Sequence, residues 1–165
     1  MIEAVHYGDP VLRETAEFVS VIDSRIKTIQ ALMVETLESY GDHAAAIAAN
    51  QVGFAVAMFV YWDPATHEPI TVINPHLDVK LGGKWDYTEG CLSLPGVYAG
   101  VVRPNHVLLT GQDLDGRDLR IEATEFLGRV FQHEYDHLQG KLFIDKLPPG
   151  KKKDAALRTL RSAHA

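Results

Sequence analysis

The feature that most constrains this chain is a pair of histidines four positions apart inside a predicted helix. Residues 122–139 carry apolar side chains at helical spacing, and Gly140 follows as a helix stop. His133 and His137 lie one turn apart in this segment, so both imidazoles project from one face and can reach one ion. Glu134 sits beside His133, where its carboxylate can reach a water on that ion. The segment therefore predicts a metal-binding helix that carries its own proton carrier.

The third metal ligand decides among classes of hydrolase. One class of zinc peptidase continues HExxHxxGxxH, but Phe143 stands in the place of the third histidine and cannot bind a metal. Another class takes a glutamate from a later helix, and no glutamate follows Glu134. Asp145 and Asp154 remain open as ligands. The stronger candidate is Cys91, the single cysteine of the chain, because a thiolate binds borderline or soft cations well and, with two histidines, leaves a position for water.

Composition indicates one ordinary globular domain. A chain of 165 residues is long enough for an independent core, and 46% of the residues are hydrophobic. The formal net charge of −6 argues against a protein that grips a phosphate backbone, so DNA is not an expected partner. No stretch approaches the roughly 20 apolar residues of a membrane span, and the N-terminus lacks the regions of a secretory signal. The chain is therefore expected in the cytoplasm, away from membranes.

The order of the predicted elements is typical of an α+β fold. The spacing predicts one helix over 24–40 behind an Asp23 cap, and a second over 122–139. Between them, short segments rich in strand formers predict antiparallel sheet around the metal-binding helix, with Asp115-Gly116 as a hairpin turn. The strand segments are residues 55–62, 69–73, 101–103, 107–112 and 119–121. The apolar stripe of the second helix comprises Phe126, Leu127, Val130, Phe131 and Leu138.

Several segments resemble the signature motifs of the peptide deformylase family. EGCLSLP and QHEYDH resemble its second and third motifs, AAIAANQVG its first, and GDPVLRETA and GKLFIDKL two further segments, together spanning residues 8–147. The resemblance implies the family's fold, with short antiparallel strands around a central HExxH helix. It also implies hydrolysis of the formyl group from the N-terminal formyl-methionine of newly made polypeptides, with release of formate. The implied cofactor is one Fe²⁺ ion, which Zn²⁺, Ni²⁺ or Co²⁺ can replace.

The resemblance also assigns roles to individual residues. Gln51 and the backbone N–H of Leu92 would hold the developing oxyanion, and Glu134 would be the general acid/base. Three residues would bind the metal: Cys91, His133 and His137.

The substrate pocket is where the sequence departs from the resembled family. The family's first motif usually begins Gly-x-Gly, and Ala44 and Ala46 occupy those places. Alanine tolerates a positive φ or the close approach of a peptide less well than glycine, so substrate range and rate stay open. The methionine pocket would be lined by Ile47, Phe126 and Val130, although their periodicity equally suits an ordinary core.

The chain divides at the Pro148-Pro149-Gly150 breaker. Residues 1–147 are the predicted deformylase-like catalytic domain, and residues 148–165 a short basic C-terminal tail whose charge suits transient contact with a ribosome.

Two alternative functions remain beside peptide deformylation. One is a deformylase or amidase that acts on another formylated or acylated substrate. The other is a non-catalytic, metal-stapled deformylase-like module. Gln51 and Glu134 argue against the module, because a structural metal site closes its fourth position and needs no proton carrier.

Overall fold

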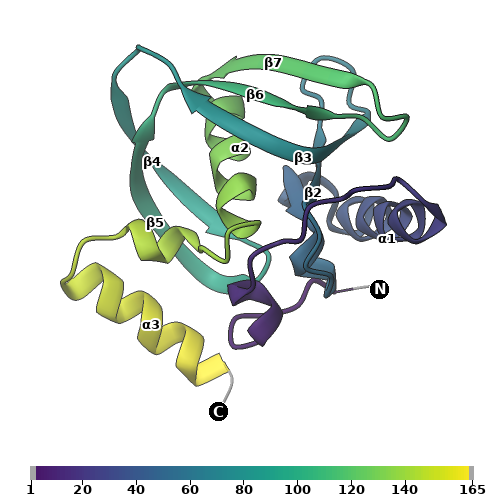
Figure 1. The fold of residues 1–165 in the computed structure, drawn as a ribbon. Coiled ribbons are helices and arrows are strands. Elements are labelled where there is room, and N and C mark those ends of the chain that lie inside the picture. The colour runs from purple at the N-terminus through teal and green to yellow at the C-terminus, as the bar shows by residue number, and fades with distance from the viewer. Residues whose placement is uncertain (1–2, 164–165) are drawn as a thin grey trace.

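The protein, described from a computed structural model over residues 3–163, consists of two antiparallel sheets with a helix between them (Figure 1). Strands β4 (Lys84–Cys91) and β5 (Leu94–Pro104) form the smaller sheet. The larger sheet contains, in spatial order, β1 (Ala46–Ala48), β2 (Met58–Trp62), β3 (Pro69–Val79), β6 (His106–Gln112) and β7 (Asp118–Thr124). The helices are α1 (Ser24–Tyr40), α2 (Glu125–His137) and α3 (Lys151–Ala163). The predicted α+β arrangement of antiparallel strands around α2 is confirmed.

Helix α1 spans the residues that the sequence predicts. The Asp23 carboxylate accepts a hydrogen bond from the backbone N–H of Ile26 at 3.0 Å, which caps the start of the helix. Gly41 ends the helix at a φ of 55°, a conformation that favours glycine. The buried face of α1 packs against the larger sheet in a cluster that includes Met33 and Met58. One face of this sheet is therefore covered by α1.

Strand β2 is apolar along its length because both of its faces are covered. Met58 and Val60 belong to the cluster under α1, whereas Phe59 and Tyr61 pack with Phe131 of α2. A strand buried on both faces shows a continuous apolar run rather than alternation. The prediction of a buried strand within residues 55–62 is therefore confirmed, with the strand beginning at Met58.

The sheets are more extensive than the sequence predicts. Strand β3 continues the predicted residues 69–73 as far as Val79, and the predicted residues 101–103 are part of the longer β5. Strands β1 and β4 were not predicted, because β1 has three residues and most of β4 is exposed and polar. Cys91 is the last residue of β4, which places the thiol where this strand of the smaller sheet ends.

Helix α2 begins at Glu125, three residues later than predicted, because residues 122–124 complete β7. Gly128 allows the two elements to approach closely, since a Cβ there would lie 3.0 Å from the carbonyl oxygen of Ala123. Most of the predicted apolar stripe faces the larger sheet. Phe126 departs from it, because its side chain is 55% exposed at the start of the helix.

Residues 151–163, predicted to belong to a basic tail, form helix α3 beside β5 (Figure 1). Ala156 and Leu160 are buried in a cluster with Leu94 and Val97. These two apolar residues lie one helical turn apart. The charged residues around them made this helical spacing hard to detect in the sequence. The division at residue 147 stays a prediction, and residues 1–2 and 164–165 of the two predicted segments lie outside the described residues. No helix within residues 3–163 is long and apolar enough to cross a membrane.

Candidate metal centre

The three predicted metal ligands converge from two elements. His133 and His137 project from α2, and Cys91 ends β4. One ligand atom from each residue lies within 4.8 Å of the other two, and Cys91 Sγ is 3.3 Å from His137 Nε2. One thiol and two imidazoles suit a borderline divalent cation and leave a coordination position open. The donor set therefore fits a catalytic metal ion.

One of the alternative ligands, Asp145, has other contacts. Asp145 forms an ion pair with Arg13, with 2.6 Å between Oδ2 and Nη1, and also accepts a hydrogen bond from the backbone N–H of Leu142. Phe143, which replaces the third histidine of one peptidase class, stacks on His133 with ring centroids 6.0 Å apart. Phe143, in the position of the missing histidine, thus packs against a proposed ligand instead of binding the metal.

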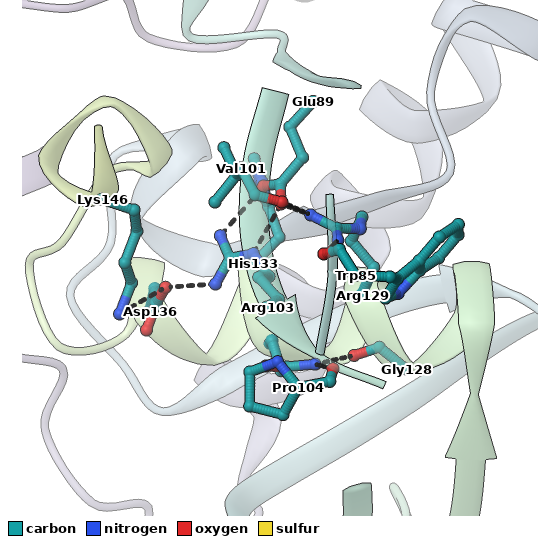
Figure 2. Close-up of polar contacts among 11 residues, drawn as sticks. Trp85, Glu89, Val101, Arg103, Pro104, Gly128, Arg129, His133, Asp136 and Lys146 are labelled. Carbon is teal, nitrogen blue, oxygen red and sulfur yellow. Dashed lines mark hydrogen bonds and ion pairs between the residues drawn. The ribbon is translucent and has the colours of Figure 1, made fainter. Parts of the chain in front are cut away.

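A buried ion-pair network holds His133 through its Nδ1 (Figure 2). Glu89 Oε1 lies 2.9 Å from His133 Nδ1, so Nε2 is free to face a metal. The Glu89 carboxylate also accepts from Arg103 Nε at 2.5 Å, Arg103 Nη2 at 2.9 Å and Arg129 Nη1 at 2.6 Å. Arg103 Nη1 donates in turn to Asp136 Oδ2 at 2.9 Å. Five charged or titratable side chains from α2, β4 and β5 thereby form one network.

The network keeps Glu89 ionised. Burial alone would raise the pKa of Glu89, but the hydrogen bonds from His133 and Arg103 and the charge of Arg103 lower it to about 2. Sequence reasoning did not single out these residues. Glu89 and Asp136 stand inside motif-like segments, which was a local signal, whereas Arg103 and Arg129 become neighbours of Glu89 only through the fold.

The two histidines differ in their electrostatic surroundings. Burial would lower the pKa of His133, but the neighbouring Cys91 and Glu89 raise it well above its ordinary value. Burial and the charge of His133 lower the pKa of His137. A cation can bind only to a thiolate and to unprotonated ring nitrogens, so metal binding at this site releases protons.

Glu134 has surroundings opposite to those of Glu89. Its side chain is buried, and its Oε2 has no hydrogen-bond partner among residues 3–163. Burial raises the pKa of Glu134 to about 7. The carboxyl group can therefore take up or release a proton near neutral pH, as a general acid/base must.

Gln51 and Leu92 lie beside the thiol, as the sequence resemblance implies. The Gln51 amide Nε2 is 3.5 Å from Cys91 Sγ and 3.1 Å from Ser93 Oγ, and its Oε1 accepts from the backbone N–H of Ala48 at 2.9 Å. Leu92 sits in the turn that joins β4 to β5 and lines the same pocket as Gln51. Ser93 is buried and accepts a hydrogen bond from Gln51, which orients the Gln51 side chain. Sequence reasoning missed this residue.

A pocket of about 310 Å³ opens in front of these residues. Phe126 and Val130 form part of its wall, as predicted, and Glu89 and Arg129 line it as well. The predicted pocket role of Ile47 is wrong, because this residue is fully buried in the cluster under α1. The pocket is therefore bounded by α2, strand β4 and residues 42–46, and two of the proposed metal ligands, Cys91 and His133, belong to its wall.

Known proteins match both the sequence and this arrangement. The family model for polypeptide deformylases matches residues 1–153. The chain belongs to the peptide deformylase family. A peptide deformylase of Endomicrobium trichonymphae is 40% identical over 160 residues, which is 96% of this chain and 94% of the relative. One of Cytophaga hutchinsonii is 39% identical over 155 residues, covering 90% of this chain and 83% of the relative.

Solved structures of deformylases share the whole fold. The peptide deformylase of Legionella pneumophila superposes with a TM-score of 0.88 at 33% identity, over 99% of this chain and 96% of that protein. That of Synechococcus elongatus, in complex with actinonin, gives a TM-score of 0.87 at 35% identity, over 97% and 86%. The resemblance stated from the sequence motifs is thus confirmed along the chain. This deformylase is a metallohydrolase that removes the N-formyl group from nascent polypeptides.

Ala44 and Ala46 distinguish this deformylase from the Gly-x-Gly pattern of its first motif. Ala44 is extended, with φ −138° and ψ 130°, and Ala46 pairs with Tyr61 in the antiparallel ladder of β1 and β2. Neither alanine has a positive φ. Both line the pocket, so any effect of the added methyl groups must come from contact with the substrate and not from backbone strain.

Proposed function

We propose that Cys91, His133 and His137 hold one divalent metal ion, Fe²⁺ in the cell, for the deformylation of N-formyl-methionyl polypeptides. The observation that carries this proposal is the convergence of the three ligand atoms beside a pocket whose wall contains Cys91 and His133 together with Glu134 and Gln51. Zn²⁺, Ni²⁺ or Co²⁺ can occupy such a site, because a thiolate and two imidazoles suit each of these ions.

The catalytic roles follow from the surroundings of each residue. When bound, the metal supplies Lewis acidity, which polarises the formyl carbonyl and acidifies a water molecule. Gln51 Nε2 and the backbone N–H of Leu92 donate hydrogen bonds to the oxygen on which negative charge develops. Glu134 takes a proton and delivers it to the nitrogen of the leaving amine, since its pKa of about 7 suits both steps. Glu89 fixes the ring orientation of His133 throughout.

The partners and place of action are extensions of the same proposal. The exposed basic residues of α3, among them Lys151, Lys152, Arg158 and Arg161, support a transient contact with the ribosome, where formylated chains emerge. The net charge of −6 supports the absence of a DNA partner. We infer a cytoplasmic enzyme that works on nascent chains and needs no membrane.

Metal analysis combined with formate release tests the ligand assignment. Protein purified without oxygen should contain about one iron per chain and release formate from formyl-Met-Ala. Cys91→Ser should lose the metal more readily on dialysis against a chelator, and Cys91→Ala more readily still, because a hydroxyl is a much poorer ligand than a thiolate. Unchanged metal content in both variants would remove Cys91 from the site and reopen Asp145 or Asp154.

A second candidate substrate class is favoured by Ala44 and Ala46, whose side chains narrow the pocket relative to the glycines of the usual motif. It comprises other formylated or acylated amides with a smaller first residue. The comparison of kcat/KM for formyl-Met-Ala and such amides decides between them. A non-catalytic, metal-stapled module is the least consistent option, because Glu134 is buried in the pocket without a hydrogen-bond partner for its Oε2 among residues 3–163.

A further inference from the structure

The proposed metal site is divided between two parts of the fold. Two ligands lie on α2, which packs mainly against the larger sheet, and Cys91 lies at the end of β4 in the smaller sheet. A catalytic metal tolerates little error in ligand position, so the two parts must be held at a fixed separation. The residues that join α2 to β4 and β5 therefore set the separation of the ligands.

Arg129 makes this connection from α2. Its Nη1 donates to Glu89 Oε2 at 2.6 Å and to the carbonyl oxygen of Val101 at 2.8 Å, and its Nη2 donates to the carbonyl oxygen of Trp85 at 2.9 Å. The guanidinium also lies over the Trp85 ring, 5.1 Å from its centroid. One buried side chain of α2 thus binds both strands of the smaller sheet and the carboxylate that holds His133 (Figure 2).

Arg103 and Arg129 bind the same carboxylate but in different ways. Arg103 binds both oxygens of Glu89 and also Asp136, so its one positive charge is shared between two carboxylates. Arg129 supplies a second positive charge, paired with Glu89 alone. Arg129 also adds position: it lies one helical turn before His133, on the same side of α2, and it lines the substrate pocket, whereas Arg103 does not.

We propose that Arg129 is a positioning residue that fixes Glu89, and through Glu89 the metal ligand His133, relative to the wall of the substrate pocket. The proposal rests on the metal site and pocket assigned above. Because Arg129 touches both the pocket and Glu89, it links the placement of the substrate side chain to the placement of His133. Removing it should loosen the metal and lower kcat for formyl-Met-Ala by a larger factor than it raises KM.

The primary test measures metal loss from the Zn²⁺-loaded full chain to excess EDTA, without substrate. Arg129→Met should release zinc roughly 10-fold or more faster than the wild type, as is typical when an outer partner of a ligand is removed. Arg129→Lys should fall between the two, because one ammonium keeps the charge but cannot reach all three acceptors. This partial rescue distinguishes positioning from a general loss of packing.

Two controls separate the alternatives. Met33→Ala lies on α1, which supplies none of the residues that line the pocket, and Met33 is fully buried. The substitution destabilises the fold by a cavity and should leave zinc loss from the folded protein near the wild-type rate. Phe126→Leu alters the pocket wall and has no hydrogen bond to Glu89, so it should change KM without faster zinc loss. Unfolding midpoints of the EDTA-treated variants identify any that fail to fold.

Zinc loss from both Arg129 variants at the wild-type rate would overturn the proposal. So would equally fast loss from Phe126→Leu or Met33→Ala, or a rise in KM with kcat unchanged in both Arg129 variants. Failure of the proposed reaction is distinguishable, because zinc retention is measured without turnover. A wild-type chain that holds zinc but releases no formate would contradict the proposed function and leave the positioning role intact.

Discussion

Glu89 and Glu134 both lie next to His133 and are buried to a similar degree, with 6% and 4% of their surfaces exposed, yet their surroundings are opposite. Glu89 accepts charge-assisted hydrogen bonds from two arginines and His133, and its pKa is lowered to about 2. Glu134 has an unpartnered carboxylate oxygen within residues 3–163, and burial raises its pKa to about 7. The comparison shows that partners, more than depth, decide whether a buried carboxylate is a fixed charge or a proton carrier.

The difference extends to the parts of the molecule that supply the two residues. Glu89 belongs to the ion-pair network that joins α2 to the smaller sheet. Glu134 lies on α2 next to the proposed ligand His133, and both glutamates line the pocket. The pocket wall thus contains one carboxylate with a fixed charge and one that can carry a proton.

The largest effect is expected for Glu134→Ala. This variant should retain its metal but lose about 10²- to 10⁴-fold in kcat, because the ligands survive while proton transfer to the amine does not. Metal content and formate release, measured on the same preparation, check the prediction. A variant that keeps more than about a tenth of the wild-type kcat would show that another group carries the proton.

Glu89→Ala should act on stability as well as on the metal. It leaves the buried Arg103 and Arg129 without their shared carboxylate, a loss of about 3–5 kcal/mol in the free energy of unfolding. Urea denaturation measures this loss in the free energy of unfolding. The exposed Glu122, which lies 3.5 Å from His106, offers a matched control, since Glu122→Ala should change stability by less than about 1 kcal/mol. Equal effects of the two substitutions would contradict the assigned role of the network.

The two glutamates should also give opposite dependences of stability on pH in chelator-treated protein. Glu89 has a lowered pKa, so its contribution is present above about pH 4.5 and is lost as the pH falls toward 2. Glu134 has a raised pKa, so its contribution is present below about pH 4.5 and is lost as the pH rises through 7. Glu134→Gln should therefore gain stability relative to the wild type between pH 5 and 8. If the free energies of unfolding of Glu134→Gln and of the wild type depended on pH in the same way, the proposed difference between the two glutamates would be contradicted.

The smallest effect is expected for Ala46→Gly. If the methyl group crowds the backbone of a formyl-methionyl peptide, its removal should lower KM several-fold and leave kcat nearly unchanged, a change on the order of 1 kcal/mol. Steady-state kinetics with formyl-Met-Ala, run beside Ala44→Gly, measure it. An unchanged or higher KM would favour a pocket fitted to a different substrate.

The sequence predicts the metal ligands because they stand in compact local patterns: two histidines one turn apart, and a single cysteine between a glycine and a proline. It also predicts α1 with its cap, since the signals for that helix are local. Strands β1 and β4 were not predicted, because a short strand and an exposed polar strand lack a clear alternation of apolar residues. The network around Glu89 was not predicted for a different reason. Arg103 and Arg129 meet Glu89 only after three elements have packed, and no spacing along the chain records that meeting.

X-ray absorption at the metal edge of the anaerobically loaded wild-type enzyme tests the central claim most directly, because it counts the atoms bound to the metal. We expect one sulfur neighbour at roughly 2.3 Å and two imidazole nitrogens at about 2.0–2.1 Å if the metal is zinc, with similar values for iron. We expect no carboxylate from Glu89 or Glu134 in direct contact with the metal. A spectrum without sulfur, or with three imidazoles, would contradict the assignment of Cys91, His133 and His137.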